Sequence, residues 1–279
     1  MADKKIFEKS PTSGIAVPIA IVLFGALIIF GVTKMLSTGK DYKDLVAELQ
    51  SKTFGNRWVA AFELSKYIAG NKIPASEVPW LVDNLASVYT SSQDTKTRQF
   101  VITAIGALHS PQASKVLSQA LLETDPEIKY QAMIAISQLP RGSVIDWTQV
   151  YRSFDLQDKG IIQVALLTIA EHKEESGKGY LLQYLQNQDS QLQLTSALGL
   201  IPFQEKSALP VLQSILQKKD ADRGELTSLE LEGIKFNILE LLEKNPWTDL
   251  ALLVSEYSLQ DPNIKISTKA RQVLNLLKN

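Results

Sequence analysis

Residues 125–139 read DPEIKYQAMIAISQL, and this segment carries the clearest structural signal in the chain. Asp followed by Pro is typical of a helix start, because Asp accepts hydrogen bonds from first-turn N–H groups and Pro needs no partner there. Ala132, Ala135 and Leu139 then follow at spacings that place them on one side of a helix. The segment is therefore predicted to be a helix that packs closely against its neighbours through small side chains.

The same pattern recurs along the chain. Related segments begin at Asp94, Asp155, Asp189 and Asp261, which with Asp125 gives intervals of 31, 30, 34 and 72 residues. The segments that begin at Asp94, Asp125 and Asp155 carry a base four residues after the Asp, and small or apolar residues seven, ten and fourteen residues after it. A helical unit repeated at such intervals, with no strand pattern between the copies, is typical of an α-solenoid.

The predicted fold is all-α: an α-solenoid, or superhelix, of about seven helix pairs, preceded by one transmembrane helix. The first helices of the pairs are predicted near residues 41–51, 76–90, 111–123, 146–154, 177–187, 205–219 and 246–259. The second helices are predicted near residues 55–70, 94–109, 125–139, 157–172, 189–201, 225–244 and 261–278.

Two segments carry a family resemblance. Asp125-Pro-Glu-Ile-Lys129 and Asp261-Pro-Asn-Ile-Lys265 resemble the second helix of HEAT repeats, including the HEAT-like repeats of phycobilisome lyases. The resemblance covers about residues 41–279 and implies a ladder in which an Asp and a base from successive repeats lie together. Tetratricopeptide repeats are the alternative, but their Trp, Leu-Gly and Tyr positions do not occur here in register.

The N-terminal part of the chain has a different character. Ile15 to Val32 contains eighteen residues without a charge, and with its extension to Leu36 it is long enough to cross about 30 Å of hydrocarbon. The predicted domains are a polar segment (1–14), a transmembrane signal-anchor helix (15–36), a linker (37–43) and a HEAT-like repeat domain (44–279). A cleaved signal peptide is the alternative, although this run is longer than such segments and lacks a good cleavage site.

The orientation of that helix follows from its flanking charges. The positive charges before the span are Lys4, Lys5, Lys9 and the amino terminus. This positive charge favours an amino terminus on the cytoplasmic side. The predicted localisation is therefore a single-pass membrane protein, with its repeat domain on the periplasmic or extracellular side. The lipid bilayer would be contacted through residues 15–36.

Composition excludes several functional classes. The 279 residues include no Cys and two His, which excludes disulfides and thiolate metal sites and leaves few metal ligands. The net charge of -1 gives no basic surface for nucleic acid. Glu171-His172 resembles half of a metal-binding pair, but His172 is interpreted as a helix-end residue. The sequence thus predicts no catalytic, cofactor-binding or metal-binding residues.

The predicted function is a membrane-anchored, non-enzymatic scaffold or adaptor that binds protein partners of unspecified identity on the concave surface of the solenoid. Residues 94–201 have the most regular register, and Arg98, Gln131 and Gln163 are the candidate partner-binding residues. Three Trp residues recur near the starts of first helices and are predicted to fill the core, with a row of partner anchors as the alternative: Trp80, Trp147 and Trp247.

Two other functions remain open at this point. A self-assembling structural component of an envelope machine would form homo-oligomers through its terminal repeats, where Val273, Leu274, Leu276 and Leu277 cluster. A HEAT-like lyase acting on a small ligand is implied by the family resemblance, and would need a deep polar pocket.

Overall fold

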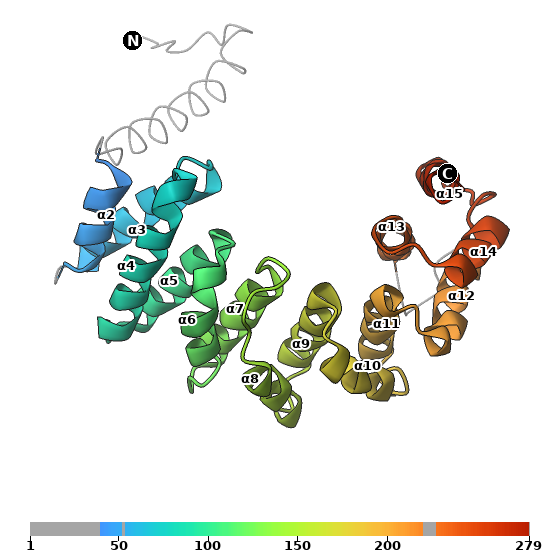
Figure 1. Cartoon of the computed structure of the whole chain (residues 1–279), viewed down its shortest axis with the longest axis horizontal. Coiled ribbons are helices and arrows are strands. Elements are labelled where there is room, and N and C mark those ends of the chain that lie inside the picture. Colours follow the sequence, from blue (N-terminus) through green and yellow to red (C-terminus); the bar gives the residue numbers. More distant parts are fainter. Residues whose placement is uncertain (1–39, 52–53, 220–226, 279) are drawn as a thin grey trace, which may run out of the picture. The chain divides into compact units, whose positions relative to one another are not determined.

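The computed structural model describes residues 40–51, 54–219 and 227–278, and within these ranges the chain is helical throughout (Figure 1). Fourteen α-helices, α2 to α15, alternate with turns and short 3-10 segments, and no strand occurs in the part described. They form seven consecutive pairs, as the sequence predicts. The chain divides into two compact units, residues 1–77 and 78–279, which are described separately below.

The first unit contains one described pair, α2 (Tyr42–Leu49) and α3 (Phe54–Ala69), followed by the 3-10 segment η1 (Ala75–Glu77). Leu45, Leu49 and Leu64 are fully buried between the helices. The hydroxyl of Tyr67 on α3 donates to the carbonyl of Lys40 at 3.0 Å, so α3 also holds the start of α2.

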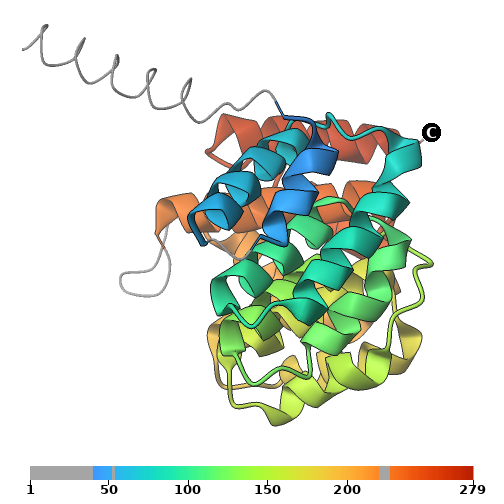
Figure 2. The same ribbon diagram turned by 90° about the vertical axis from the view of Figure 1, so that its left-hand side faces the viewer.

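The second unit contains the other six pairs (Figures 1 and 2), and most of its consecutive second helices contact one another. Its first helices are α4 (Val78–Ser91), α6 (Ser114–Ala120), α8 (Trp147–Arg152), α10 (Lys178–Tyr184), α12 (Leu209–Gln217) and α14 (Thr248–Tyr257). Its second helices are α5 (Thr95–Ala107), α7 (Pro126–Ser137), α9 (Lys159–His172), α11 (Ser190–Gly199), α13 (Ser228–Lys244) and α15 (Ile264–Leu276). Short 3-10 segments adjoin several of them: η2 (Pro111–Ala113), η3 (Ser153–Asp155), η4 (Glu175–Gly177), η5 (Ile201–Phe203) and η6 (Lys206–Ala208).

Three of the five predicted N-caps are confirmed. Asp94 accepts from the N–H of Thr97 at 2.8 Å, and Asp125 accepts from the N–H groups of Glu127 and Ile128 at 2.9 and 3.0 Å. Asp189 caps α11 in the same way. These bonds satisfy first-turn N–H groups that have no partner inside the helix.

The other two predicted caps are wrong by two or three residues. Asp155 lies in η3, and the cap of α9 is Asp158, which accepts from the N–H of Ile161 at 2.9 Å. The cap of α15 is Asn263 rather than Asp261. In both places two residues able to cap a helix lie within one turn, so composition alone does not decide between them. In each place the residue that caps the helix lies three positions before a buried side chain, Ile161 after Asp158 and Ile266 after Asn263.

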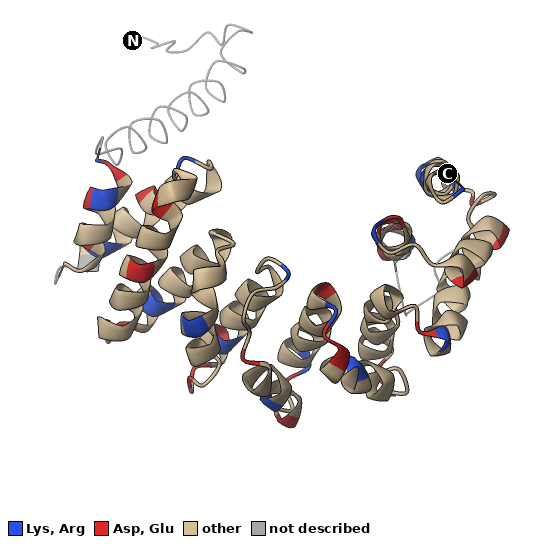
Figure 3. Cartoon of the chain, viewed as in Figure 1, with Lys and Arg blue, Asp and Glu red and all other residues tan. Residues whose placement is uncertain are grey.

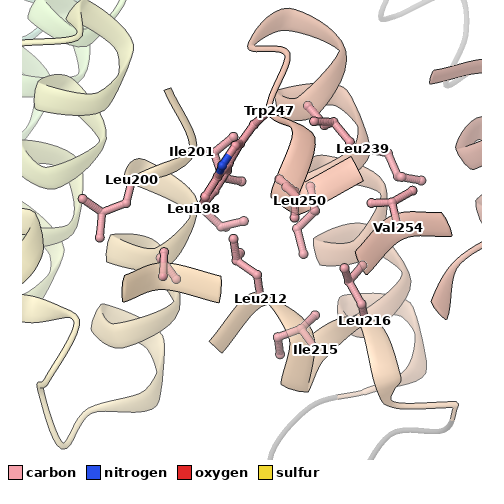
Figure 4. Packing of buried hydrophobic residues seen from close by; sticks show 14 of the residues in the cluster. Leu198, Leu200, Ile201, Leu212, Ile215, Leu216, Leu239, Trp247, Leu250 and Val254 are labelled. Carbon is pink, nitrogen blue, oxygen red and sulfur yellow. The ribbon is translucent and has the colours of Figure 1, made fainter. Parts of the chain in front are cut away.

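The core of the second unit is continuous across repeats. In its C-terminal half, Leu212, Leu239, Leu250 and Val254 pack around Trp247, whose ring is 5% exposed (Figure 4). Trp247 is therefore a core residue, as predicted. Trp147 is half-buried and belongs to a chain of stacked rings with Tyr151, Tyr180 and Phe154, while Trp80 is also half-buried.

Ion pairs connect successive second helices near their amino ends, in the manner that the HEAT resemblance implies. Arg98 of α5 pairs with Glu123, which precedes α7, and Lys159 of α9 pairs with Asp189, the cap of α11, at 2.8 Å. Lys235 of α13 pairs with Asp261, just before α15, at 2.6 Å. Figure 3 shows acidic and basic residues interspersed along the described helices. Each pair joins a base to an acid of the next repeat.

Hydrogen bonds connect the repeats at the opposite, carboxyl ends of the same helices. His109, in the left-handed backbone region at φ 46°, lies 3.2 Å through Nδ1 from the carbonyl oxygen of Gln138. Arg141 Nε donates to the carbonyl of Glu171 at 2.8 Å, and Gln204 Nε2 donates to the carbonyl of Pro246 at 2.7 Å. These side chains satisfy carbonyl groups at the ends of the neighbouring second helices.

The structure corrects the predicted localisation. Among the described residues no helix is long and apolar enough to cross a membrane, because the longest, α13, has 17 residues and includes charged side chains. This finding contradicts the predicted single-pass location with the repeat domain on the non-cytoplasmic side. The segment to which the span was assigned, 15–36, lies outside the described residues, as do 1–14.

The buried ion pair gives a first prediction. The side chains of Lys235 and Asp261 are 4% and 5% exposed, and Lys235 also donates to the carbonyl of Lys218. Lys235→Ala leaves a carboxylate without its partner in the core, so we expect a loss of about 3–5 kcal/mol in the free energy of unfolding, measured by urea denaturation. The matched control Lys159→Ala breaks an exposed pair and should cost about 0–1 kcal/mol. Equal losses in the two variants would contradict this account.

The close contact of α5 and α7 gives a second prediction. A Cβ added at Gly106 would lie 2.6 Å from the Cβ of Ala135, so the helices must move apart to accept it. We expect Gly106→Ala to lower the free energy of unfolding by about 1–3 kcal/mol despite the better helix propensity of Ala. Gly179→Ala is the control, because a Cβ there meets nothing within 4 Å, and it should stabilise by about 0.5–1 kcal/mol. Thermal unfolding of both variants would show opposite shifts, and shifts of the same sign would refute the explanation.

Candidate partner-binding groove

The caps define which side of each second helix faces outward. In α5, α7, α9 and α11 the residue three positions after the cap is buried. Nine positions after the cap, the helices carry Thr103, Ile134, Leu167 and Leu198 in turn. Leu167 is 42% exposed and Ile134 is half-buried, so neither side chain is enclosed in the core. Ile134 and Leu167 therefore lie on the outward sides of α7 and α9, whereas Leu198 of α11 is 9% exposed and belongs to the core.

Leu167 and Leu198 line hollows formed mainly by the second helices, with Val211, Ser214 and Ile215 of α12 contributing to one of them. One hollow of about 500 Å³ is lined by the carboxyl ends of α7, α9, α11 and α13, and a second of about 650 Å³ is lined mainly by the amino-terminal halves of α9, α11 and α13. Leu198 and Asn237 line both hollows, so the two adjoin. We call them together the second-helix groove. Its apolar residues include Leu167, Leu198 and Leu241.

Amide side chains flank these apolar residues. Gln191 Nε2 donates to Gln163 Oε1 at 3.3 Å, and Gln163 Nε2 donates to the hydroxyl of Thr195 at 3.2 Å. That hydroxyl donates in turn to the carbonyl of Gln191 at 2.8 Å. Asn237 on α13 completes the set and is exposed. The groove therefore offers both donors and acceptors beside its apolar floor.

The charges in the groove largely neutralise one another. Lys159 donates a hydrogen bond to Asp189 and, with the backbone N–H of Leu192, lowers the pKa of that carboxyl. Arg141 and Glu171 lie 3.8 Å apart at the carboxyl ends. Glu230 accepts from the backbone and hydroxyl of Thr227, which lower the pKa of Glu230. These charged groups already form ion pairs or hydrogen bonds within the protein, so they present little unpaired charge to a ligand.

The structure brings one of the three predicted binding residues into this groove. Gln163 lines it, beside Lys159 and Gln191. Gln131 lies on α7 outside the groove, where its Nε2 donates to Glu127 at 2.8 Å. Arg98 also lies outside it and forms part of the tie between α5 and the start of α7. The role of all three in partner binding stays a prediction.

Arg98 belongs to a compact polar cluster with Tyr89 and Glu123. The Tyr89 hydroxyl donates to Glu123 at 2.8 Å and accepts from Arg98 at 3.1 Å, and the guanidinium lies 4.7 Å from the Tyr89 ring centroid. Burial and the Glu123 carboxylate raise the pKa of Tyr89 to about 12. The neutral phenol is therefore the form that this cluster requires.

Sequence reasoning missed Leu167, Leu198 and Asn237 as groove residues. Both leucines lie nine residues after a cap, and Leu167 is on the side of α9 away from the core. The positions compared in the sequence lie seven, ten and fourteen residues after each Asp, so the ninth position was not considered.

His172, the other residue singled out by sequence, has a structural environment. Its Nε2 lies 2.9 Å from the carbonyl oxygen of Ile136, and its ring meets the edge of Trp147 at a centroid distance of 5.8 Å. Across residues 40–51, 54–219 and 227–278, no three acidic or His side chains lie close enough together to hold a metal ion.

Comparison with known proteins identifies the fold. No protein-family model and no curated protein matches the chain. The chain is similar to the complex of CpcE and CpcF of phycocyanin lyase from Nostoc sp. PCC7120, with a TM-score of 0.55 and 17% identity, over 86% of this chain and 94% of that chain. It is also similar to the X-ray structure of Escherichia coli YibA, with a TM-score of 0.53 and 14% identity, over 84% and 81%. This likeness confirms an all-helical solenoid fold.

The polar cluster gives a third prediction. Because the neutral form of Tyr89 is favoured in the folded state, the folded protein keeps a proton that the unfolded chain releases above its ordinary pKa of 10.0. Stability should therefore fall as the pH rises from 10.0 towards about 12. Glu123→Gln should lower the Tyr89 pKa while leaving it above 10.0, since burial remains.

The measurement is tyrosinate absorbance during alkaline titration, with the Tyr89→Phe curve subtracted in both the wild-type and Glu123→Gln backgrounds. The subtraction is needed because burial also raises the pKa of Tyr151 to about 12. An unchanged Tyr89 midpoint in Glu123→Gln would show that the carboxylate does not act on this phenol.

Proposed function

We propose that this protein is a non-enzymatic scaffold or adaptor, and that it binds a segment of a partner protein in the second-helix groove. The observation that carries the proposal is Leu167, an apolar side chain that is 42% exposed within a groove instead of being placed in the core. Apolar residues in a concave surface with flanking polar groups are typical of sites that bury a ligand. A solenoid provides such a surface over several repeats.

The self-assembly alternative is less well supported by the last helix. Val273 is buried, and Leu274 and Leu277 pack against the core, which leaves Leu276 as the exposed member of that cluster. The exposed side of α15 also carries Ile264, beside polar residues such as Arg271 and Gln272.

The lyase alternative rests on likeness of fold. At 17% identity, the similarity to the phycocyanin lyase chains concerns architecture and transfers no activity. The groove residues described above are amides, aliphatic side chains and paired charges. This set is suited to holding a polypeptide, whereas acid–base chemistry needs a titratable group free to exchange protons with a substrate.

The experiment compares two substitutions of exposed leucines. Leu167→Glu places a charge in the groove, whereas Leu252→Glu places one on α14, where Leu252 is 64% exposed and outside the groove. We expect Leu167→Glu to reduce the recovery of a stoichiometric partner by about tenfold or more, since a buried unpaired charge is strongly unfavourable. Leu252→Glu should leave recovery unchanged.

Recovery is measured by affinity purification of the full-length protein after crosslinking in cells, with quantitative mass spectrometry. Circular dichroism verifies that both variants fold. Partners that remain with Leu167→Glu but are lost with Leu252→Glu would place the binding surface elsewhere. The absence of any partner would remove the scaffold function.

A further inference from the structure

We infer that the occupant of the second-helix groove is an extended, uncharged polypeptide segment with aliphatic side chains, held through its main chain by Gln163, Gln191 and Asn237. This inference rests on the proposed function and specifies the form of the partner. It follows from the amides, from the balance of charge and from the dimensions of the groove.

The amides retain unused hydrogen-bonding capacity. Gln163 donates one N–H to Thr195 and accepts one bond from Gln191, which leaves one N–H and one lone pair. Gln191 uses one N–H and keeps the other together with its carbonyl oxygen. The side chain of Asn237 has no hydrogen-bond partner within the described part of the chain. Donors and acceptors therefore lie together on both sides of the apolar floor.

An extended ligand matches this arrangement better than a helix does. The main-chain N–H and C=O groups of a helix are bonded internally, so a helix laid over the groove would cover the amides without satisfying them. An extended segment presents unpaired N–H and C=O groups along its edges, and its alternate side chains point to one face. Those side chains can rest on Leu167 and Leu198 while the main chain bonds to Gln163 and Asn237.

The charge balance selects an uncharged segment. Lys159 is paired with Asp189, and Arg141 lies beside Glu171, so a charged ligand would have to compete with bonds already made. Lys244, at the carboxyl end of α13, also lines the groove and is exposed. The middle of the groove, around Leu198 and Asn237, carries no charge.

The dimensions limit the length of the segment. Helices α9 and α11 pack directly, at a typical separation of about 8–10 Å, and α13 lies farther from α11 because the two have little direct contact. An extended chain rises about 3.3 Å per residue, so at least about six residues are needed to reach from α9 to α13. A short segment of a larger protein, such as a tail or a loop, meets this requirement.

The test is a selection from a random peptide library displayed on phage. The library is selected on the immobilised full-length protein after depletion on the Leu167→Glu variant, so that recovered peptides depend on the groove. We expect uncharged sequences with aliphatic residues at alternate positions. Groove-dependent peptides that are strongly charged, or that form amphipathic helices, would overturn the inference while leaving the proposed function standing. Failure to recover any groove-dependent peptide would count against both.

A second measurement examines the main-chain bonds. A selected peptide is resynthesised with single N-methyl groups on successive backbone nitrogens, and its affinity is measured by fluorescence anisotropy. We expect about tenfold weaker binding at the nitrogens that face the amides, because each change removes a donor to a buried acceptor. Equal affinity for every methylated peptide would show that recognition does not use the main chain.

Matched protein variants complete the design. Gln163→Ala and Asn237→Ala should each weaken the same peptide by about three- to tenfold, whereas Gln131→Ala, outside the groove, should not. Affinity should change by less than about twofold between about 50 and about 500 mM salt, since no unscreened charge is involved. A steep salt dependence would reassign the ligand to a charged class.

Discussion

The hydrogen bonds that an Asp or Asn side chain accepts at the start of a second helix set the register of that helix. Once Asp158 is bonded to the N–H of Ile161, Ile161 faces the core and Leu167 faces outward. The residue three positions after Asp94, Asp125 and Asp189 is buried in the same way. The face that each second helix turns to solvent thus depends on one polar contact, because a shift of one residue would turn the helix by about 100° and bury a different stripe.

Side-chain contacts join successive repeats at both ends of the second helices. Bases on α5, α9 and α13 reach acids that precede the next second helix, and side chains such as His109 and Gln204 reach carbonyl groups at the opposite ends. The ion pairs differ more in burial than in the distance between their charged atoms. Lys235 and Asp261 are almost completely enclosed, whereas Lys159 and Asp189 remain partly in water. Neighbouring repeats with similar ion pairs are therefore held with different strength.

Much of the architecture was predictable because its causes are local. Helix periodicity, breaks at Gly and Pro, and the spacing of Asp residues place all seven pairs near their observed positions. The caps at Asp158 and Asn263 were not predictable, since each competes with an Asp within one turn and the choice depends on tertiary burial of Ile161 and Ile266. Gln163 was among the predicted residues, whereas Leu167 was missed because its exposure depends on tertiary packing. The hydrogen bond from Gln163 to Thr195 joins residues 32 apart in the sequence, which no local pattern encodes.

The unequal ties between second helices have a mechanical consequence. When the contacts between repeats differ in stiffness, a solenoid bends unevenly, and most of the bending occurs at the weakest contact, or joint. The joint between α9 and α11 has a water-exposed ion pair, and it lies beneath the groove. The joint between α13 and α15 has the enclosed one. Dissolved ions reach the exposed pair and not the enclosed one, so sensitivity to salt is confined to the joint beside the groove, where the pair contributes only about 0–1 kcal/mol and the packed helices hold the groove in place.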